Sequence, residues 1–341
     1  MATLKDIAAE AGVSIMTVSN VINENYSRVS EKNILKIKEL IKKYNYVPNL
    51  SARSLSSKSS KIIVTFLPKD DPLVNYFSNP YMGELFGEIE TLIRKQDYFV
   101  LIRSLEKISS IPTILKNWNA DGAIILTHQS HSDMKTITHS SECPVVFIDS
   151  YDTEDFAALT VGINEYKGGY TATKHLIYNG HKKIAFAGPY SETNDIVYNR
   201  YLGYRAALKE AGIEYSSSRV IKTNTTYEDG IRIGKAIANN AYDVSAVFAT
   251  ADILAIGIME GLHRNGMIVP NDLSVVGFDN LQICSFVTPK LTTISQNVRQ
   301  KAESAVNLLM QAIRDNSFRK SAINLDVELK ERQSVRKLVS T

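Results

Sequence analysis

The sequence is poor in cysteine and tryptophan and contains no long apolar run. Its two cysteines among 341 residues are too few for a disulfide framework or a cysteine-rich zinc site. No apolar stretch approaches the roughly 20 residues of a membrane-spanning helix. The N-terminus carries acidic residues where a signal peptide needs an apolar core. We therefore expect a soluble, cytoplasmic protein, whose length corresponds to two or three domains of about 150 residues each.

Signatures of common enzymes are also missing from the sequence. It contains no dinucleotide-binding G-x-G-x-x-G, no G-x-S-x-G nucleophile elbow and no zinc-binding H-E-x-x-H. Gly230 and Gly234, which precede Lys235, have the wrong spacing for a P-loop. His128 and His131 lie in a polar stretch without the carboxylates or cysteines that complete a metal site. We therefore predict no catalytic activity, no metal and no cofactor.

Positive charge is concentrated at one end of the chain. The whole sequence has 39 Lys and Arg against 36 Asp and Glu, a net charge of +3. Residues 1–60 hold nine of the basic and five of the acidic side chains, so the remainder is close to neutral. A basic segment on a neutral body indicates a polyanionic partner, although a solvated basic face has the same composition.

Three short helices are predicted in this basic segment. Thr3 and Asp6 have the spacing of a capping box at the start of the first helix, and Gly12 ends that helix. Ser14 can cap a second helix and Ser30 a third. Because only a tight turn separates the first two helices, the segment is predicted to form a helix-turn-helix.

The second helix has one apolar face and one uncharged polar face. Val18, Val21 and Ile22 recur at the spacing of an inward face. Short or amide side chains on the other face suit a surface that reads base edges, because carboxylates would be repelled by phosphate. A small helical bundle with a neutral face is the alternative. The outward residues are Ile15, Met16, Thr17, Ser19, Asn20 and Asn23.

From residue 61 onward, short apolar segments alternate with amphipathic ones, such as residues 82–94. This alternation predicts doubly wound parallel sheets with helices on both faces, and two such series indicate two lobes. The candidate strands are residues 62–67, 98–104, 123–127, 145–149, 184–188, 246–250 and 274–279. The chain is expected to cross between the lobes near residues 161–164, 291–296 and 322–328.

Three ordered motifs resemble one known family. They read T-L-K-D-I-A-x-x-A-G-V-S-x-x-T-V-S at residues 3–19, V-S at 29–30 and Y-x-P-N-x-x-A-R-S-L at 46–55. Together they resemble the lactose/galactose-repressor family of bacterial transcription regulators. The resemblance implies a small all-α helix-turn-helix DNA-binding domain and a two-lobed α/β, periplasmic-binding-protein-like regulatory domain.

The resemblance also implies the domain boundaries. A helix-turn-helix headpiece would span residues 1–48, a hinge helix and linker 49–60, and an effector-binding and dimerisation domain 61–341. Lobe one would comprise about 61–162 and 295–322, and lobe two about 163–292 and 325–341. The two lobes would close about a hinge on a small ligand.

DNA contacts follow from the resemblance position by position. Base contacts in the major groove are implied for Ile15, Met16 and Asn20. The hinge helix, whose leucine would enter the minor groove as an apolar wedge, contains Asn49, Ala52, Arg53 and Leu55. Phosphate or sugar contacts are implied for Ser14, Thr17, Ser19, Asn23, Ser30 and Tyr46. Leu4 completes the DNA-binding set.

Asn20 departs from the arginine that the family often has at this position. Arginine pairs with guanine, whereas asparagine suits adenine. Ile15 and Met16 can offer only apolar contact, most naturally to a thymine methyl. We therefore expect A·T base pairs at these operator positions.

Candidate effector contacts lie at strand ends and loops of the two-lobed domain. Tyr81 can stack on the apolar face of a sugar or pack as a core aromatic, and Asp149 ends a predicted strand. Arg200 and Asp279 match the family's ligand-binding arginine and aspartate, whereas Asp252 fits a helix N-cap better than a ligand contact. Two carboxylates and an arginine suit vicinal hydroxyls, so the expected effector is a sugar or sugar phosphate.

The implied function is a repressor that binds a palindromic operator as a homodimer and responds to an effector, as inducer or as corepressor. Two departures leave the effector open. Thr225 stands where relatives often carry an aromatic, although Tyr227 is close by, and Ala251 where sugar-responsive members often carry asparagine. The alternatives are a purine-responsive repressor and a global carbon catabolite regulator that uses a phosphorylated phosphocarrier protein. No membrane partner is expected.

Overall fold

The structure, a computed structural model, divides the chain into two units, Met1–Ser60 and Lys61–Thr341. It describes residues 2–47, 59–67, 77, 79–104, 107–126, 130–151, 158–191, 195–316 and 320–338. Within these ranges, no helix has the length and apolar character that crossing a membrane requires. The predicted residues that lie outside the described ranges are Asn49, Ala52, Arg53, Leu55 and His128.

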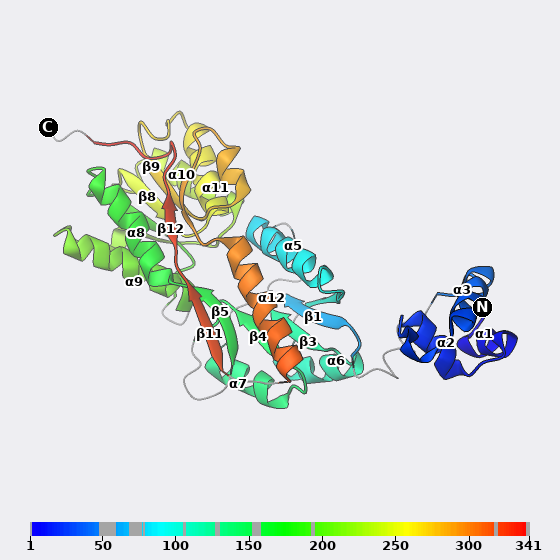
Figure 1. The fold of residues 1–341 in the computed structure, drawn as a ribbon. Helices are drawn as coiled ribbons and strands as arrows, with labels where there is room; N and C mark the ends of the chain where they lie inside the picture. Colours follow the sequence, from blue (N-terminus) through cyan, green and yellow to red (C-terminus); the bar gives the residue numbers. More distant parts are fainter. Residues whose placement is uncertain are drawn as a thin grey trace. The chain divides into compact units, whose positions relative to one another are not determined.

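The first unit is a bundle of three helices around a small apolar core. The helices are α1 (Leu4–Ala11), α2 (Ile15–Ile22) and α3 (Glu31–Lys43), with a short 3-10 helix, η1 (Tyr26–Arg28), before α3 (Figure 1). Core residues come from all three α-helices and are Ile7, Ala8, Ala11, Val18, Val21, Ile37 and Leu40. The prediction of a helix-turn-helix is confirmed.

Local caps set the ends of these helices. Thr3 and Asp6 form the capping box of α1, and Gly12 ends α1 in the left-handed conformation at a φ of 70°. Ser14 caps α2 through its side chain, as predicted. Ser30 occupies the N-cap position of α3, but its side chain makes no capping hydrogen bond. The expectation that the Ser30 side chain caps this helix is therefore wrong. Ser30 is exposed to solvent.

The first lobe of the second unit is built on a six-stranded parallel sheet. One face is covered by α5 (Pro80–Arg94) and α12 (Val298–Asp315), the other by α6 (Ile111–Asn117) and α7 (His131–Ser140). Because both faces are covered, the inner strands consist mainly of apolar residues. In spatial order the strands are β11 (Ser321–Leu325), β5 (Leu159–Ile163), β4 (Val145–Ile148), β3 (Gly122–Ile125), β1 (Ile62–Leu67) and β2 (Phe99–Ser104).

The second lobe repeats this plan, with one antiparallel strand at an edge. One face is covered by α8 (Glu165–Tyr178) and α9 (Asp195–Glu210), the other by α10 (Tyr227–Ala238) and α11 (Asp252–His263). The edge strand β12 runs antiparallel to β10. In spatial order the strands are β12 (Glu328–Lys330), β10 (Thr292–Ser295), β9 (Ser274–Asp279), β8 (Ala246–Ala249), β6 (Ile184–Gly188) and β7 (Val220–Lys222).

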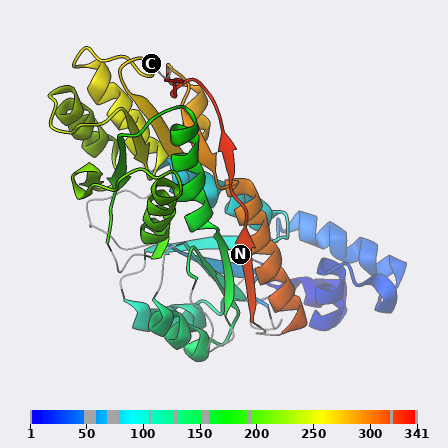
Figure 2. The ribbon, with the colours of Figure 1, turned by 90° about the vertical axis from the view of Figure 1, so that its left-hand side faces the viewer.

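The chain passes between the lobes after β5, after β10 and after β11. Figures 1 and 2 show α12, in orange, returning along the first lobe, and β11 and β12, in red, leading from one lobe into the other. The doubly wound α/β prediction is confirmed. Strand β11 continues to Leu325, beyond the expected end of its lobe at residue 322. The structure also has five strands that are not among the predicted ones: β5, β7, β10, β11 and β12.

Gly230 and Gly234, which the sequence could not assign, serve helix packing in the second lobe. They lie on α10 and face Gly257 and Gly261 of α11, which have the same spacing. A Cβ on Gly257 would lie 2.2 Å from the Tyr227 carbonyl oxygen, and a Cβ on Gly230 would lie 2.7 Å from the Gly257 Cα. The two backbones are therefore in direct contact, which residues with a Cβ would prevent.

Candidate functional site

The outward face of α2 is apolar at its tip and uncharged throughout. Ile15 and Met16 are 48% and 70% exposed, whereas Val18 and Val21 on the opposite face are buried. Asn20 lies on the next turn and is half-buried. Adjacent exposed apolar side chains and an amide can contact thymine methyls and adenine edges in a major groove. The structure thus places the predicted base-reading residues together on one helix.

The predicted phosphate-contacting residues of α2 flank this tip. Ser14 Oγ and Thr17 Oγ1 lie 2.9 Å apart, and Asn23 Nδ2 donates to Ser19 Oγ at 3.3 Å. These hydrogen bonds order short polar side chains along the helix, and their hydroxyls keep further hydrogen-bonding capacity.

Two other predicted DNA contacts are partly used in folding. Leu4 and Tyr46 are half-buried and pack against the core of the first unit. The exposed Ser30 hydroxyl makes no capping bond. Of these three residues, Ser30 therefore contributes least to the folding of the first unit.

Tyr81 and Asp149 meet in the first lobe. Asn79 caps α5 and Pro80 is its first residue, so Tyr81 lies in the first turn. Asp149 follows β4 in a left-handed bend with a φ of 58°. Tyr81 Oη donates to Asp149 Oδ2 at 2.8 Å. Burial, and after it the neighbouring Asp149 charge, raises the pKa of Tyr81.

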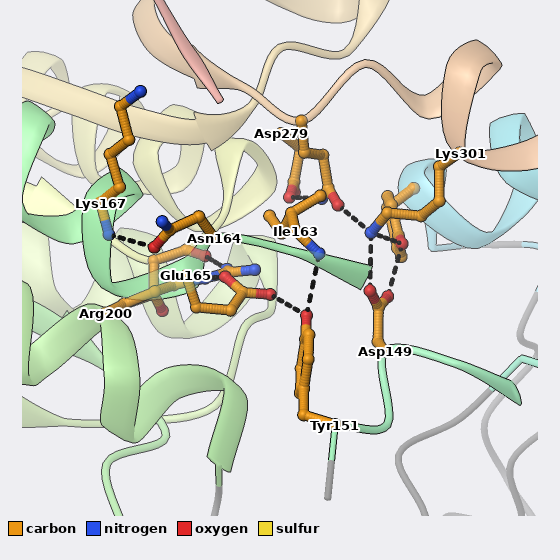
Figure 3. Close-up of polar contacts among 12 residues, drawn as sticks. Asp149, Tyr151, Ile163, Asn164, Glu165, Lys167, Arg200, Asp279 and Lys301 are labelled. Carbon is orange, nitrogen blue, oxygen red and sulfur yellow. Dashed lines mark hydrogen bonds and ion pairs between the residues drawn. The ribbon is translucent and has the colours of Figure 1, made fainter. Parts of the chain in front are cut away.

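Lys301 of α12 reaches the same carboxylate, and it was not predicted. Its Nζ donates to Asp149 Oδ1 at 2.7 Å (Figure 3). The same Nζ donates to Tyr81 Oη at 3.0 Å. The Lys301 side chain is fully buried. The available signal was a lysine on the face of α12 that also carries Val298 and Ala305, where an amphipathic helix is apolar.

Gln296 connects Lys301 to Asp279 of the second lobe. Lys301 Nζ also donates to Gln296 Oε1, and Gln296 Nε2 donates to Asp279 Oδ1 at 2.5 Å. Asp279 ends β9 at a φ of 118°. Burial, and after it the charge of Asp252, raises the pKa of Asp279 well above its usual value. The predicted carboxylates Asp149 and Asp279 are thus joined across the lobes through two residues that sequence reasoning missed.

Arg200 of α9 is engaged by protein groups. Its Nε donates to Glu165 Oε2 at 2.6 Å, its Nη1 donates to the Thr250 carbonyl at 2.6 Å, and its guanidinium lies 3.6 Å from the Phe278 ring centroid. Tyr151, which follows β4 of the first lobe, donates to Glu165 Oε1 at 3.0 Å (Figure 3). The predicted arginine therefore belongs to a second polar chain between the lobes.

Asp252 holds the segment after β9 in place by hydrogen bonds. The N-cap residue of α11 is Ala251, which makes no side-chain cap, so the expected N-cap role of Asp252 is wrong. Its carboxylate instead accepts the Leu281 N–H at 2.9 Å and the Thr293 hydroxyl at 2.5 Å. Burial raises the pKa of Asp252 to about 6. Asp252 therefore supports the segment that carries Asp279 and does not face a ligand freely.

Carboxylate acceptors and N–H donors converge between the lobes at this site. Arg200 uses two of its five N–H groups in the contacts above, so it keeps donors for a ligand. Within the described ranges, no cluster of three or more His, Cys, Asp or Glu side chains is placed to hold a metal ion. The chemistry available here is hydrogen bonding to a polar small molecule.

The chain combines a helix-turn-helix unit with a two-lobed body, and a polar site lies between the two lobes. This combination defines a ligand-responsive DNA-binding regulator. Residues 3–49 match the family of bacterial regulatory proteins called the lacI family. Residues 173–335 match the periplasmic binding protein-like domain family. The HTH-type transcriptional repressor PurR of Vibrio campbellii is 31% identical over 99% of this chain and 100% of its own. The protein belongs to the lacI family of bacterial transcription regulators.

Other relatives cover nearly the whole chain. The HTH-type transcriptional regulator DegA of Bacillus subtilis is 34% identical over 97% of both chains. The transcriptional regulator CelR, solved as a complex with cellobiose, is 25% identical with a TM-score of 0.71 and covers 98% of this chain and 100% of its own. The Lac repressor dimer bound to operator and an anti-inducer is 24% identical with a TM-score of 0.85, over 98% of this chain and 99% of its own.

Proposed function

We propose that this regulator is a homodimeric repressor that binds a palindromic operator and whose affinity for that operator is set by a small polyhydroxy effector. It acts by binding, without catalysis, on DNA in the bacterial cytoplasm. The observation that carries DNA binding is the uncharged face of α2, on which Ile15 and Met16 are exposed beside Asn20. A twofold dimer reads a palindromic site because the symmetry of the protein matches that of the two half-sites.

Selection of bound sites from a random duplex pool tests the DNA-binding proposal. We expect the full-length chain to select two inverted half-sites, and its affinity to fall steeply with salt because counterions are released from phosphates. Met16→Asp should abolish this binding, since a carboxylate would face the groove. Leu35→Asp, which places the same charge at an exposed apolar residue of α3, is the matched control. Failure to select any motif would contradict the proposal.

Dimerisation is supported by an exposed apolar edge on the first lobe. Phe99 and Ile102 are exposed on β2, which is the edge strand of its sheet. Exposed apolar edge strands are rare in monomers because they invite pairing with another chain. Sedimentation of the full chain should show a dimer, and Phe99→Lys should shift it toward the monomer. A wild type that sediments as a monomer would exclude this part of the proposal.

A polyhydroxy effector is supported by the groups at the site. Asp149 and Asp279 supply carboxylate oxygens, and Arg200 retains N–H donors, a set that suits vicinal hydroxyls. Two relatives were solved with sugars: CelR with cellobiose, and a lacI-family regulator from Enterococcus faecium with ribose. The latter is 26% identical with a TM-score of 0.71, over 81% of this chain and 100% of its own.

A purine is the second candidate, because PurR repressors are 31% identical to this chain over nearly its whole length. A flat base needs aromatic faces for stacking. The face of Phe278 is covered by Arg200, and Tyr227 packs against the apolar core below α10 and α11. These contacts occupy two of the aromatic side chains on which a base could stack, and this supports a polyol.

Calorimetric titration of the full chain discriminates the effector classes. The panel consists of neutral sugars, their phosphate esters, hypoxanthine, guanine and a phosphorylated phosphocarrier protein. We expect a sugar to bind and to change operator affinity, in either direction, in a gel-shift assay. Binding of purines alone would establish the second candidate, and a response to the phosphocarrier protein alone would establish a global catabolite regulator.

A further inference from the structure

Lys301 is saturated by protein acceptors. An ammonium group has three N–H donors, and three acceptors surround this one: Asp149 Oδ1, Tyr81 Oη and Gln296 Oε1. The side chain is fully buried, so these contacts take the place of water. A ligand that enters the site therefore meets neither a free ammonium donor nor an uncompensated positive charge at Lys301.

The second buried cation is also compensated. Arg200 forms an ion pair with Glu165 at 2.6 Å, and both side chains are buried. Its remaining N–H groups can donate to a ligand, but its charge is already balanced. Asp149 and Glu165 thus neutralise the two buried cations that the structure describes at this site.

Asp279 is the carboxylate left over from these pairs. Its Oδ1 is held by the uncharged amide of Gln296. An anionic ligand would bring beside Asp279, in a buried site, a charge that neither Lys301 nor Arg200 can balance, because both cations are already paired with protein carboxylates. A hydroxyl group would instead donate to the same oxygens and accept from Arg200 without any change in net charge.

We propose that Lys301 is a specificity-determining residue, which neutralises Asp149 from within the protein and thereby restricts the effector to uncharged polyhydroxy molecules. Phosphate esters of the same molecules are excluded. This inference rests on the proposed function only in placing the effector between the lobes. It deepens that proposal by removing the sugar phosphates from the candidate effectors.

Asp149→Asn provides a gain-of-function test with inorganic phosphate as the probe. The substitution keeps the shape of the side chain but removes the charge that balances Lys301. We expect phosphate to raise the melting temperature of Asp149→Asn more than that of the wild type, at matched ionic strength. The double variant Asp149→Asn/Lys301→Met should lose this extra response, because the freed cation is gone.

Arg299→Met is the matched control for loss of a cation from α12. Arg299 is exposed and pairs with Glu303 on the helix surface, so this variant should respond to phosphate as the wild type does. A folded Asp149→Asn whose response to phosphate is equal to or weaker than that of the wild type would overturn the proposal.

A second measurement uses the wild type alone and does not depend on the folding of any variant. Calorimetry compares ribose with ribose 5-phosphate, glucose with glucose 6-phosphate, and galactose with galactose 1-phosphate. For whichever sugar binds, we expect the neutral form to bind more than about tenfold more tightly than its ester. Tighter binding of an ester would overturn the proposal. If purines bind and no sugar does, the polyhydroxy effector fails, while the phosphate experiment still decides the role of Lys301.

Discussion

Arg200 Nε and Glu165 Oε2 lie 2.6 Å apart in an ion pair whose side chains are 9% and 3% exposed. Removing one partner of a buried pair leaves the other charge unpaired in the protein, which costs about 3–5 kcal/mol. We predict that Glu165→Ala lowers the free energy of unfolding by about this amount. Urea denaturation followed by circular dichroism measures the change.

The exposed pair between Lys174 and Glu210 supplies the matched control. It joins α8 to α9, as the buried pair does, with a distance of 2.8 Å. Because solvent screens exposed charges, Glu210→Ala should have little effect on stability. Equal losses of unfolding free energy in Glu165→Ala and Glu210→Ala would show that burial does not increase the contribution of the Arg200–Glu165 pair to stability.

The contact between α10 and α11 predicts a second stability effect. A Cβ on Gly257 would lie 2.2 Å from the Tyr227 carbonyl oxygen, so Gly257→Ala must push the two helices apart. Overpacking of this kind costs about 1–3 kcal/mol. Gly87→Ala on α5 is the control, because a Cβ there meets no atom within 4 Å. Denaturation curves should show a loss for Gly257→Ala and none for Gly87→Ala, since alanine favours helix more than glycine does.

Sequence patterns predicted the fold where the structure depends on local burial. β1, β4, β6 and β9 lie between two helical layers, and their sequences are therefore predominantly apolar. β10, with the sequence Thr-Thr-Ile-Ser, and the three-residue β12 carry no such signal. Both lie next to the passages between lobes, so their pairing is set by the tertiary path of the chain.

The same distinction separates the predicted from the missed residues of the site. Tyr81 and Asp149 could be predicted because each lies at an element end that the local sequence marks. Lys301 and Gln296 come from the segment that follows β10 and returns from the second lobe to the first. Their contact with Asp149 and Asp279 depends on that return, which spacing along the chain does not reveal.

Asp252 is predicted to make stability depend on pH. Burial raises its pKa from 3.8 to about 6, so the folded state holds this proton more tightly than the unfolded state does. The resulting stabilisation is complete below pH 3.8 and is lost as the pH rises through about 6. Between about pH 7 and pH 5, the wild type should gain about 1 kcal/mol relative to Asp252→Asn.

Urea denaturation of both proteins at these pH values measures the difference. His175 and His181 have pKa values lowered by burial, so their protonation destabilises the folded state as the pH falls. Both histidines are present in the wild type and in the variant, and their contribution cancels in the comparison. Parallel pH profiles would show that Asp252 does not titrate in this range.

Asn20 is predicted to determine one base pair in each operator half-site. Asn20→Arg should change the preference there from A·T to G·C, because arginine donates two hydrogen bonds to guanine, a contact worth about 1–3 kcal/mol of discrimination. Sites selected from a random duplex pool by the two proteins measure this change. Ser30→Ala is the control: its hydroxyl is exposed and caps no helix, so loss of a phosphate contact should weaken binding to all sequences alike. A guanine requirement in the wild type that persists in Asn20→Ala would show that another residue reads this position.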